Sequence, residues 1–541
     1  MPDNPSPEPS FNLWYEPWID LECLDGSIER VGIGPALLEA HRYRAIVSHS
    51  PLEVAGIQRL LVAVLQDALN PQHLDDLANL WEQDCFPPGP IETFERYFAT
   101  RFDLFSTDQP FLQSADLPRS PVKGDRIKPV TYLAPEFPSG SGVVHYRHAL
   151  EDEQVFCPVC CARGLVMVPA FATSGGAGIK PSINGVPPIY LLPQGRTLYY
   201  ALLASIILPS YQPAVREKDE DCPWWRGPNV VSRSTEVTSV GYVESLTFPA
   251  RRVRLHPDVG PMICTRCGHP ARLGVRTMVF DMGLSRPKDS PFWQDPFAAY
   301  LVREKEAPLP VRPTQGKAAW REFANFFLKV PPGMQRKGAR PSLRPRVVDQ
   351  LEELQDYGVP FDDARMDFRS IGMRTDMKAK IFEWVDSGYS VPLALLHSST
   401  AGLDVDDALA FAEQCIYITV NAFRKQFNPE SKKSQRMARL QSELKDSIWR
   451  ELAAPFHKFI STLADAASQP ADQQEALRRE ALQEWMNTCK EKALDRLEVL
   501  LDELGDGART LRMRYSCLDE ASRNLYNLLK KEATADDRTV S

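Results

Sequence analysis

Residues 471–503 read ADQQEALRREALQEWMNTCKEKALDRLEVLLDE, and this segment sets the architecture of the C-terminal part of the chain. Its apolar residues recur mostly at three- and four-residue steps, at Leu477, Ala481, Leu482, Trp485, Cys489, Leu494, Leu497 and Leu501. An α-helix has about 3.6 residues per turn, so this spacing places them on one face. The stripe predicts a long helix with one buried side, and core packing explains it without a cofactor.

Similar stripes occur at roughly 404–427, 433–466 and 517–531. Pro455 lies inside the second of these and predicts a kink, because proline has no backbone N–H to donate. Turn-forming residues at 468–470 and 505–507 separate the later helices. Long helices with short connections pack as antiparallel neighbours. We therefore expect an all-α four-helix bundle over residues 401–535, followed by a disordered tail at 536–541.

The N-terminal part has a different character, because most of the 46 prolines precede residue 362. Apolar periodicity predicts a buried helix over 52–69 and a second helix over 92–102. Short β-type runs, such as 164–168 and 274–279, alternate with long loops. We expect an irregular mixed α/β domain over residues 1–362, with 363–400 as a connecting region. The whole chain is thus of the α+β class, and its 541 residues are too many for one core.

The location of the protein bears on its 11 cysteines. No apolar run approaches the roughly 18 residues of a membrane span, and the N-terminus is polar and proline-rich rather than a signal sequence. We therefore expect a cytoplasmic protein with no membrane partner, in which thiols stay reduced and paired cysteines bind metal.

Two Cys-x-x-Cys motifs, Cys157–Cys160 and Cys264–Cys267, have the spacing that directs both thiolates of a pair at one metal ion. Two such motifs complete a tetrahedral site, for which structural Zn²⁺ is the best fit. A redox pair, an iron–sulfur site and unrelated buried thiols remain alternatives. Cys161 adjoins the first motif and is an alternative ligand.

A glycine-rich loop, Ser174-Gly-Gly-Ala-Gly178 followed by Ile179 and Lys180, resembles a phosphate loop only superficially. A Walker-type loop needs lysine directly after its last glycine, followed by serine or threonine. Here Ile179 intervenes, so ATP binding is disfavoured. Either the segment is an ordinary turn, or its side-chain-poor backbone approaches another surface closely, with Lys180 adding charge.

Charge is unevenly distributed in a chain with a net charge of −8. Three basic clusters stand out, one within residues 331–348, one at 374–380 and one at 424–439. Such clusters are usually solvated faces, but their segregation in an acidic chain favours phosphate contact by at least one of them.

Several motifs, taken in order, resemble the CasA family, the large subunits of the type I-E CRISPR Cascade complex. They are Phe11-Asn-Leu13, Trp18-Ile19, Gln109-Pro-Phe-Leu-Gln113, the Cys-x-x-Cys that leads into the glycine-rich loop, the second Cys-x-x-Cys and the closing bundle. The resemblance covers nearly the whole chain. It implies a non-catalytic subunit of an RNA-guided machine, in which guide RNA reads the target and the protein checks the short flanking motif, or PAM.

The resemblance also implies roles for particular residues. The PAM of double-stranded target DNA would be read through its minor groove by Ser174, Gly175, Gly176, Ala177 and Gly178, with Lys180 and Arg276. A wedge that opens the duplex would contain Met377 and Lys378. The guide RNA would meet Tyr146 and His148, and the DNA backbone would meet Arg336, Lys337, Arg340, Arg424 and Lys425. The remaining partners would be the other Cascade subunits and a helicase-nuclease.

Two other classes of protein are possible. A zinc-dependent hydrolase is disfavoured because the chain has no His-Glu-x-x-His motif, and an all-cysteine site has no open position for water. A zinc-stabilised protein–protein adaptor without DNA contact is the other alternative.

Overall fold

The computed structural model describes residues 8–137, 153–174, 178–213, 221–303, 306–329, 341–375, 381–398, 400–427, 435–504 and 507–536. It divides into two compact units. The first contains residues 1–315 and 342–390, and the second contains residues 316–341 and 391–541. The sequence placed boundaries at 362 and 400 instead, whereas in the structure most of that region belongs to strands of the first unit.

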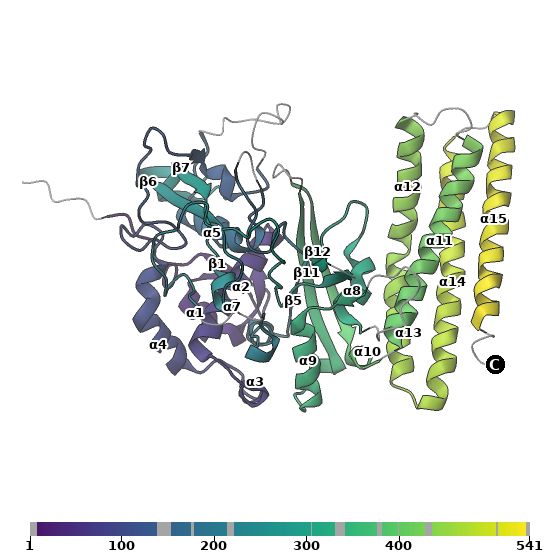
Figure 1. Ribbon diagram of the computed structural model, residues 1–541, viewed down its shortest axis with the longest axis horizontal. Helices are drawn as coiled ribbons and strands as arrows, with labels where there is room; N and C mark the ends of the chain where they lie inside the picture. The colour runs from purple at the N-terminus through teal and green to yellow at the C-terminus, as the bar shows by residue number, and fades with distance from the viewer. Residues whose placement is uncertain are drawn as a thin grey trace, which may run out of the picture. The chain divides into compact units, whose positions relative to one another are not determined.

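The first unit mixes helices and strands, as Figure 1 shows. Its α-helices are α1 Ile33–Leu38, α2 Pro51–Leu69, α3 Leu74–Trp81, α4 Pro88–Phe98, α5 Pro158–Phe171, α6 Leu198–Leu203, α7 Tyr242–Leu246 and α9 Arg346–Asp356. Its strands are β1 Ile19–Cys23, β2 Ile28–Val31, β3 Tyr43–Val47, β4 Ile127–Pro129, β5 Tyr190–Pro193, β6 Arg251–Ile263, β7 Pro270–Met282, β8 Tyr300–Arg303, β9 Glu306–Pro310, β10 Ser342–Leu343, β11 Arg365–Thr375 and β12 Ile381–Pro392.

The described strands form small sheets of three, in the orders β2-β1-β3, β4-β7-β6, β10-β8-β9 and β12-β11-β5. The longest pairing is the antiparallel β6–β7 hairpin, which runs from Arg251 opposite Met282 to Ile263 opposite Pro270. β11 pairs with β5, where Phe368 lies opposite Pro193, and this pairing ties the segment after residue 342 to the first unit.

Helix α2 is the centre of the first unit, and the helix predicted over 52–69 is confirmed. It is buried on nearly all sides, including the polar residues Gln58 and Gln66. Both amides form hydrogen bonds: Gln58 Nε2 donates to Pro193 O at 3.0 Å, and Gln66 Oε1 accepts from Ile207 N at 3.0 Å. Burial of these polar groups is therefore compatible with a stable core.

The β-type run predicted at 164–168 is wrong, because these residues belong to helix α5. Cys157 is the N-cap of this helix, and Pro158 stands at its first position, where the missing N–H costs nothing. The helix is apolar nearly all round and buried, so it lacks the one-sided stripe from which helices are recognised. The β-type run at 274–279 is confirmed as part of β7.

The second unit is helical. Its helices are η6 Ala319–Glu322, α8 Phe323–Phe327, α10 Leu393–Leu396, α11 Ala401–Phe427, α12 Gln435–Glu451, α13 Ala453–Ala467, α14 Ala471–Asp502 and α15 Ala508–Asp536. The predicted stripes thus correspond to α11, to α12 with α13, to α14 and to α15. The helix is interrupted between α12 and α13, just before Pro455, because proline has no backbone N–H to donate to the preceding turn.

An aromatic cluster fills the core of the second unit. The ring of Trp485 on α14 lies 5.7 Å from Phe456 and 5.7 Å from Phe459, both on α13. Its Nε1 donates to Ala408 O on α11 at 2.7 Å. Trp320 packs on Phe456 at 4.7 Å, which explains why residues 316–341 belong to this unit rather than to the first.

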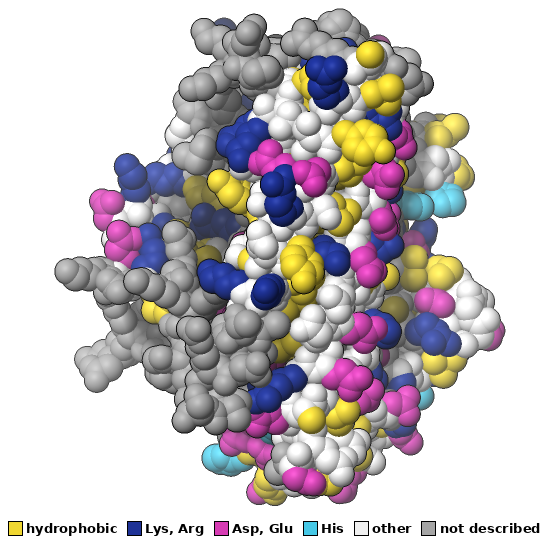
Figure 2. Space-filling model, turned by 90° about the vertical axis from the view of Figure 1, so that its right-hand side faces the viewer, with side chains coloured by type: hydrophobic (Ala, Val, Ile, Leu, Met, Phe, Trp, Pro, Cys, Tyr) yellow, Lys and Arg dark blue, Asp and Glu magenta, His cyan; other side chains and the backbone are white. Residues whose placement is uncertain are grey.

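Charged side chains of both signs are interspersed on the face seen in Figure 2, with apolar side chains scattered between them. None of the helices in the described segments combines the length and the hydropathy that crossing a bilayer requires.

Candidate metal centre and adjoining loop

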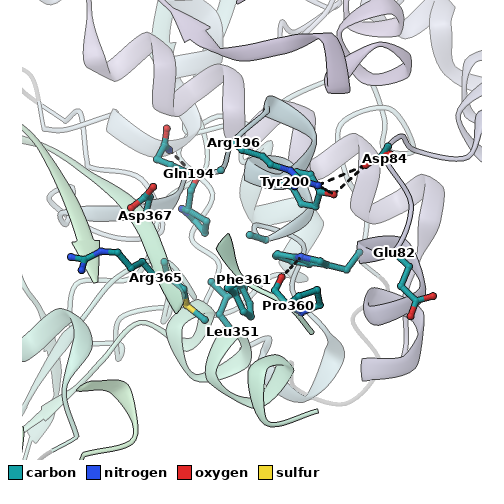
Figure 3. A pocket seen from close by; sticks show the side chains of 15 residues that line it. Glu82, Asp84, Gln194, Arg196, Tyr200, Leu351, Pro360, Phe361, Arg365 and Asp367 are labelled. Carbon is teal, nitrogen blue, oxygen red and sulfur yellow. Dashed lines mark hydrogen bonds and ion pairs between the residues drawn. The ribbon is translucent and has the colours of Figure 1, made fainter. Parts of the chain in front are cut away.

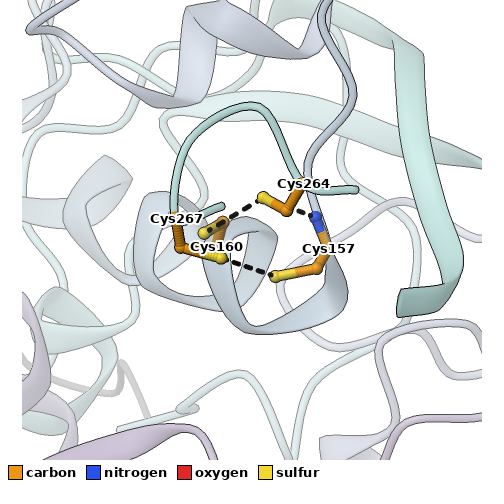
Figure 4. Close-up of side chains that lie close together, drawn as sticks. All are labelled: Cys157, Cys160, Cys264 and Cys267. Atoms are coloured by element: carbon orange, nitrogen blue, oxygen red, sulfur yellow. Dashed lines mark hydrogen bonds between the residues drawn. The ribbon is translucent and has the colours of Figure 1, made fainter. Parts of the chain in front are cut away.

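Cys157, Cys160, Cys264 and Cys267 come together in one cluster, as Figure 4 shows. Their sulfur atoms all lie within 4.8 Å of one another. Two distances across the cluster, Cys157 Sγ to Cys267 Sγ and Cys160 Sγ to Cys264 Sγ, are both 3.7 Å. A tetrahedral site with metal–sulfur bonds of about 2.3 Å separates its sulfurs by about 3.8 Å. The four side chains therefore fit one tetrahedral metal ion.

Local structure explains how each pair of cysteines is presented. The first pair lies at the N-terminus of α5, with Cys157 as N-cap and Cys160 in the first turn. The second pair lies in the turn of the β6–β7 hairpin, where Gly268 has a φ of +75° and its N–H donates to Cys264 O at 2.8 Å. Glycine adopts such a φ without strain, so it closes the turn that holds both thiols on one side.

Electrostatics favour a cation in this cluster. Hydrogen bonds to Cys157 and Cys264, together with burial, raise the pKa of the Cys160 thiol. Hydrogen bonds from Cys157 and Cys160 lower the pKa of Cys264 in return. Closely spaced buried thiols cannot all ionise together unless a cation compensates their charge, and a metal ion supplies that charge.

Cys161 points away from this cluster. It is fully buried, and its Sγ faces the backbone oxygen of Phe156 at 3.9 Å. Burial, the first cause, raises the pKa of its thiol well above the ordinary value. The group of four cysteines close enough to hold one metal ion does not include Cys161.

Arg266, between Cys264 and Cys267, anchors the second pair to the rest of the first unit. Its guanidinium lies between two carboxylates. Its Nη2 is 2.5 Å from Glu53 Oε1 of α2, and its Nε donates to Glu136 at 2.7 Å. Its Nη1 also donates to Cys160 O at 3.4 Å. Glu53 is buried, so this ion pair replaces the water that the carboxylate loses on folding.

Buried Arg251, at the start of β6, holds the base of the glycine-rich loop. Its guanidinium donates to Thr173 O and, at 2.9 Å, to Lys180 O. A backbone bond from Ser182 N to Ala172 O, at 2.9 Å, closes the same base. Burial lowers the pKa of Arg251 to about 10, so it remains protonated at neutral pH. Sequence inspection missed this residue, because a buried arginine in a strand looks the same as an exposed one.

The cysteine cluster and the loop thus lie at opposite ends of the same two elements. Helix α5 carries Cys157 and Cys160 at its start and leads into the loop at its end. The β6–β7 hairpin carries Cys264 and Cys267 at its turn and Arg251 at its far end. A 14-residue helix is about 21 Å long. Clamping both ends therefore holds the loop base in a defined position.

Four of the residues predicted to meet DNA in the first unit are described. Ser174 is partly buried, and Gly178 has a φ of +80° with open space where a Cβ would stand. The Nζ of Lys180 pairs with Glu236, and both side chains are exposed. Arg276 projects from β7 and lies 3.6 Å from Asp258.

Arg424 and Lys425 lie in the last turn of α11, in the second unit. Lys425 pairs with Glu520 of α15 at 2.6 Å, and Arg424 donates to Asn421 at 2.7 Å. The remaining predicted site residues lie outside the described residues. They are Tyr146, His148, Gly175, Gly176, Ala177, Arg336, Lys337, Arg340, Met377 and Lys378.

Fold and site together define a class of protein: a mixed α/β unit in which a four-cysteine cluster secures a loop-bearing helix, joined to a helical unit. Comparisons with known proteins agree on one family. The family model for CRISPR-associated protein Cse1 matches residues 12–495. The chain belongs to the CRISPR-associated protein Cse1 family, and the resemblance inferred from its motifs is confirmed.

Individual relatives agree with this assignment. The CRISPR-associated protein CasA/Cse1 of Thermus thermophilus is 30% identical over 537 residues, covering 92% of this chain and 99% of the relative. The crystal structure of Thermus thermophilus CasA has a TM-score of 0.72 and 25% identity, covering 97% of this chain and 100% of that chain. A chain of a CRISPR RNA-guided surveillance complex has the same fold. The two chains have a TM-score of 0.70 and 16% identity, and the match covers 96% of this chain and 100% of that chain.

Proposed function

We propose that this chain is the large, non-catalytic subunit of a CRISPR RNA-guided surveillance complex, Cascade, and that it reads the PAM of invading double-stranded DNA. The observation that carries the proposal is the family match across residues 12–495. The shared fold with a chain of a surveillance complex supports it. In this proposal the four cysteines hold structural Zn²⁺, which contributes stability and no chemistry.

The glycine-rich loop is the proposed reader of the PAM. The minor groove carries a degenerate donor and acceptor code, so a backbone that approaches closely is a suitable probe of it. Arg251 supports this role because it fixes Thr173 and Lys180 on the two sides of the loop. Gly175, Gly176 and Ala177 would meet the groove, and Lys180 and Arg276 would add positive charge beside it.

The other assignments follow from the family and remain part of the proposal. Met377 and Lys378 would form the wedge that opens the duplex beyond the PAM, since apolar side chains can unstack a base step. Tyr146 and His148 would contact the 5′ end of the guide RNA. Arg336, Lys337, Arg340, Arg424 and Lys425 would bind DNA backbone, and the complex would recruit a helicase-nuclease.

A binding experiment on the assembled complex tests this function. The chain is co-expressed with its partner subunits and guide RNA, and duplexes that differ only in the flanking motif are titrated at several salt concentrations. We expect Lys180→Glu to weaken binding of the preferred duplex about tenfold and to lower the salt dependence. Lys288→Glu, which reverses an exposed charge elsewhere in the first unit, is the matched control. Equal affinity of the unmodified complex for every flanking motif would overturn the assigned reader.

A further inference from the structure

The first unit contains a cavity of about 360 Å³ that has no part in the proposed nucleic-acid contacts, shown in Figure 3. Four separate segments form its wall: the end of α3 with the following loop, the loop from β5 into α6, helix α9 with the turn after it, and the start of β11. Its volume is in the range of pockets that hold small ligands or single side chains. None of the residues predicted to bind DNA, RNA or metal lines it.

Three aromatic rings form one side of the cavity. Trp81 is central, with its ring 5.0 Å from Phe361 and 5.7 Å from Tyr200. Its Nε1 donates to Pro360 O at 3.1 Å, so the indole is fixed in its orientation. An array of electron-rich ring faces attracts cations, because each face carries partial negative charge.

The cavity already contains one guanidinium bound in this manner. Arg196 lies over the Tyr200 ring with its Cζ 4.3 Å from the ring centroid, and its Nη2 is 3.8 Å from Asp84. Tyr200 also donates its hydroxyl to Asp84 at 3.4 Å. Arg196 thus shows that a guanidinium can stack on an aromatic ring of this wall beside a carboxylate.

Two side chains on the opposite side can accept further hydrogen bonds. Asp367 and Gln194 are adjacent, since Gln194 N donates to Asp367 O at 2.8 Å. Within the described parts of the chain, the Asp367 carboxylate accepts no hydrogen bond and forms no ion pair. The nearby cation Arg365 is directed at Ser390 instead, to which its Nε and Nη2 donate at 2.9 and 2.7 Å. Glu82 adds a further negative charge at the rim.

We propose that this cavity binds an arginine side chain presented by an exposed segment of a partner protein. The guanidinium would stack on the aromatic wall while Asp367 accepts its N–H groups, a bidentate geometry that carboxylates favour. Arginine suits the site better than lysine, because its planar group stacks on rings and forms paired hydrogen bonds. The lining contains none of the residues proposed to read DNA, so this site is independent of that role.

Peptide binding to the full-length protein tests this inference. The probes are three capped tripeptides, acetyl-Gly-Arg-Gly-amide, its lysine counterpart and its citrulline counterpart, with binding followed by ligand-observed NMR at millimolar concentrations. Citrulline has nearly the same shape as arginine but no charge. We expect the affinity order arginine, lysine, citrulline. Absence of arginine-peptide binding, or equal binding of the citrulline peptide, would overturn the proposal.

Two variants locate the binding within the cavity. Asp367→Asn removes the acceptor charge and should weaken arginine-peptide binding about three- to tenfold. Phe361→Leu keeps an apolar side chain but removes a ring face, so it should reduce the preference for arginine over lysine. Glu353→Gln neutralises an exposed carboxylate of α9 outside the cavity and is the matched control. Equal effects of Asp367→Asn and Glu353→Gln would contradict the assigned position, and an unchanged melting temperature confirms that each variant is folded.

Discussion

The two units of this protein achieve stability by different means. The first is built from short elements separated by long loops, and it relies on contacts between residues far apart in sequence. Arg59 and Asp295, for example, form an almost completely buried ion pair at 2.7 Å. The second unit has long helices whose apolar faces meet around Trp485, and its ion pairs, such as Arg478 with Asp404, are partly exposed.

The difference shows what a loop-rich unit requires. Loops bury little apolar surface per residue, so the entropy lost in ordering them needs compensation from strong local links. The four-cysteine cluster and the buried ion pairs are such links. The helical unit gains enough from its apolar stripes to do without them.

Loss of the proposed zinc ion should reduce the stability of the first unit more than any other change considered below. We expect Cys160→Ser to release about one equivalent of zinc and to destabilise the first unit by more than about 5 kcal/mol, because metal binding contributes directly to folding. Elemental analysis and hydrogen exchange measured by mass spectrometry would test this. Exchange should increase in α5 and at the turn of β6–β7, but not in α11 to α15.

The exposed Cys85, which lies outside the cluster, supplies the control. Cys85→Ser should leave metal content and exchange unchanged. If Cys160→Ser retained the metal, or if both units lost protection equally, the cluster would not be a metal site that stabilises the first unit specifically.

The buried ion pair of the first unit should give the next largest effect. Burial opposes the charge on Arg59, but Asp295 holds the pKa of the guanidinium above its ordinary value. Asp295→Asn keeps the shape yet leaves that charge buried without its partner. We expect a loss of about 3–5 kcal/mol in the free energy of unfolding, measured by chemical denaturation. Asp289→Asn, at an exposed carboxylate in the preceding loop, should change it by less than about 0.5 kcal/mol.

The smallest effect is expected for the partly exposed ion pair of the second unit, and its size tests the contrast between the two units. Arg478 donates to both carboxylate oxygens of Asp404, at 2.6 and 2.8 Å, but a quarter of the arginine side chain is exposed. Solvent screens the interaction, so Asp404→Asn should cost about 1 kcal/mol. Denaturation of this variant beside Asp465→Asn, an exposed acid on α13, measures the difference. A cost equal to that of Asp295→Asn would remove the distinction between the units.

Prediction from sequence succeeded where a pattern is local. The spacing of apolar residues located α2 and the long helices of the second unit, and Pro455 marked the break between α12 and α13. Cys-x-x-Cys spacing identified the four residues of the cluster. Residues 164–168 of helix α5 were mistaken for a β-type run because the helix is apolar nearly all round, so its helical periodicity was not visible.

Composition and spacing predicted the fold class, the helical C-terminal part and the two cysteine motifs of the cluster, and the order of several motifs resembled one family. Only the tertiary structure decided that Arg251 holds both sides of the glycine-rich loop and that Arg266 ties the second cysteine pair to Glu53. It also decided that Trp81, Asp367 and Phe361 share one cavity. Local periodicity reports how each segment buries its apolar side, whereas these contacts join residues that only the folded chain brings together.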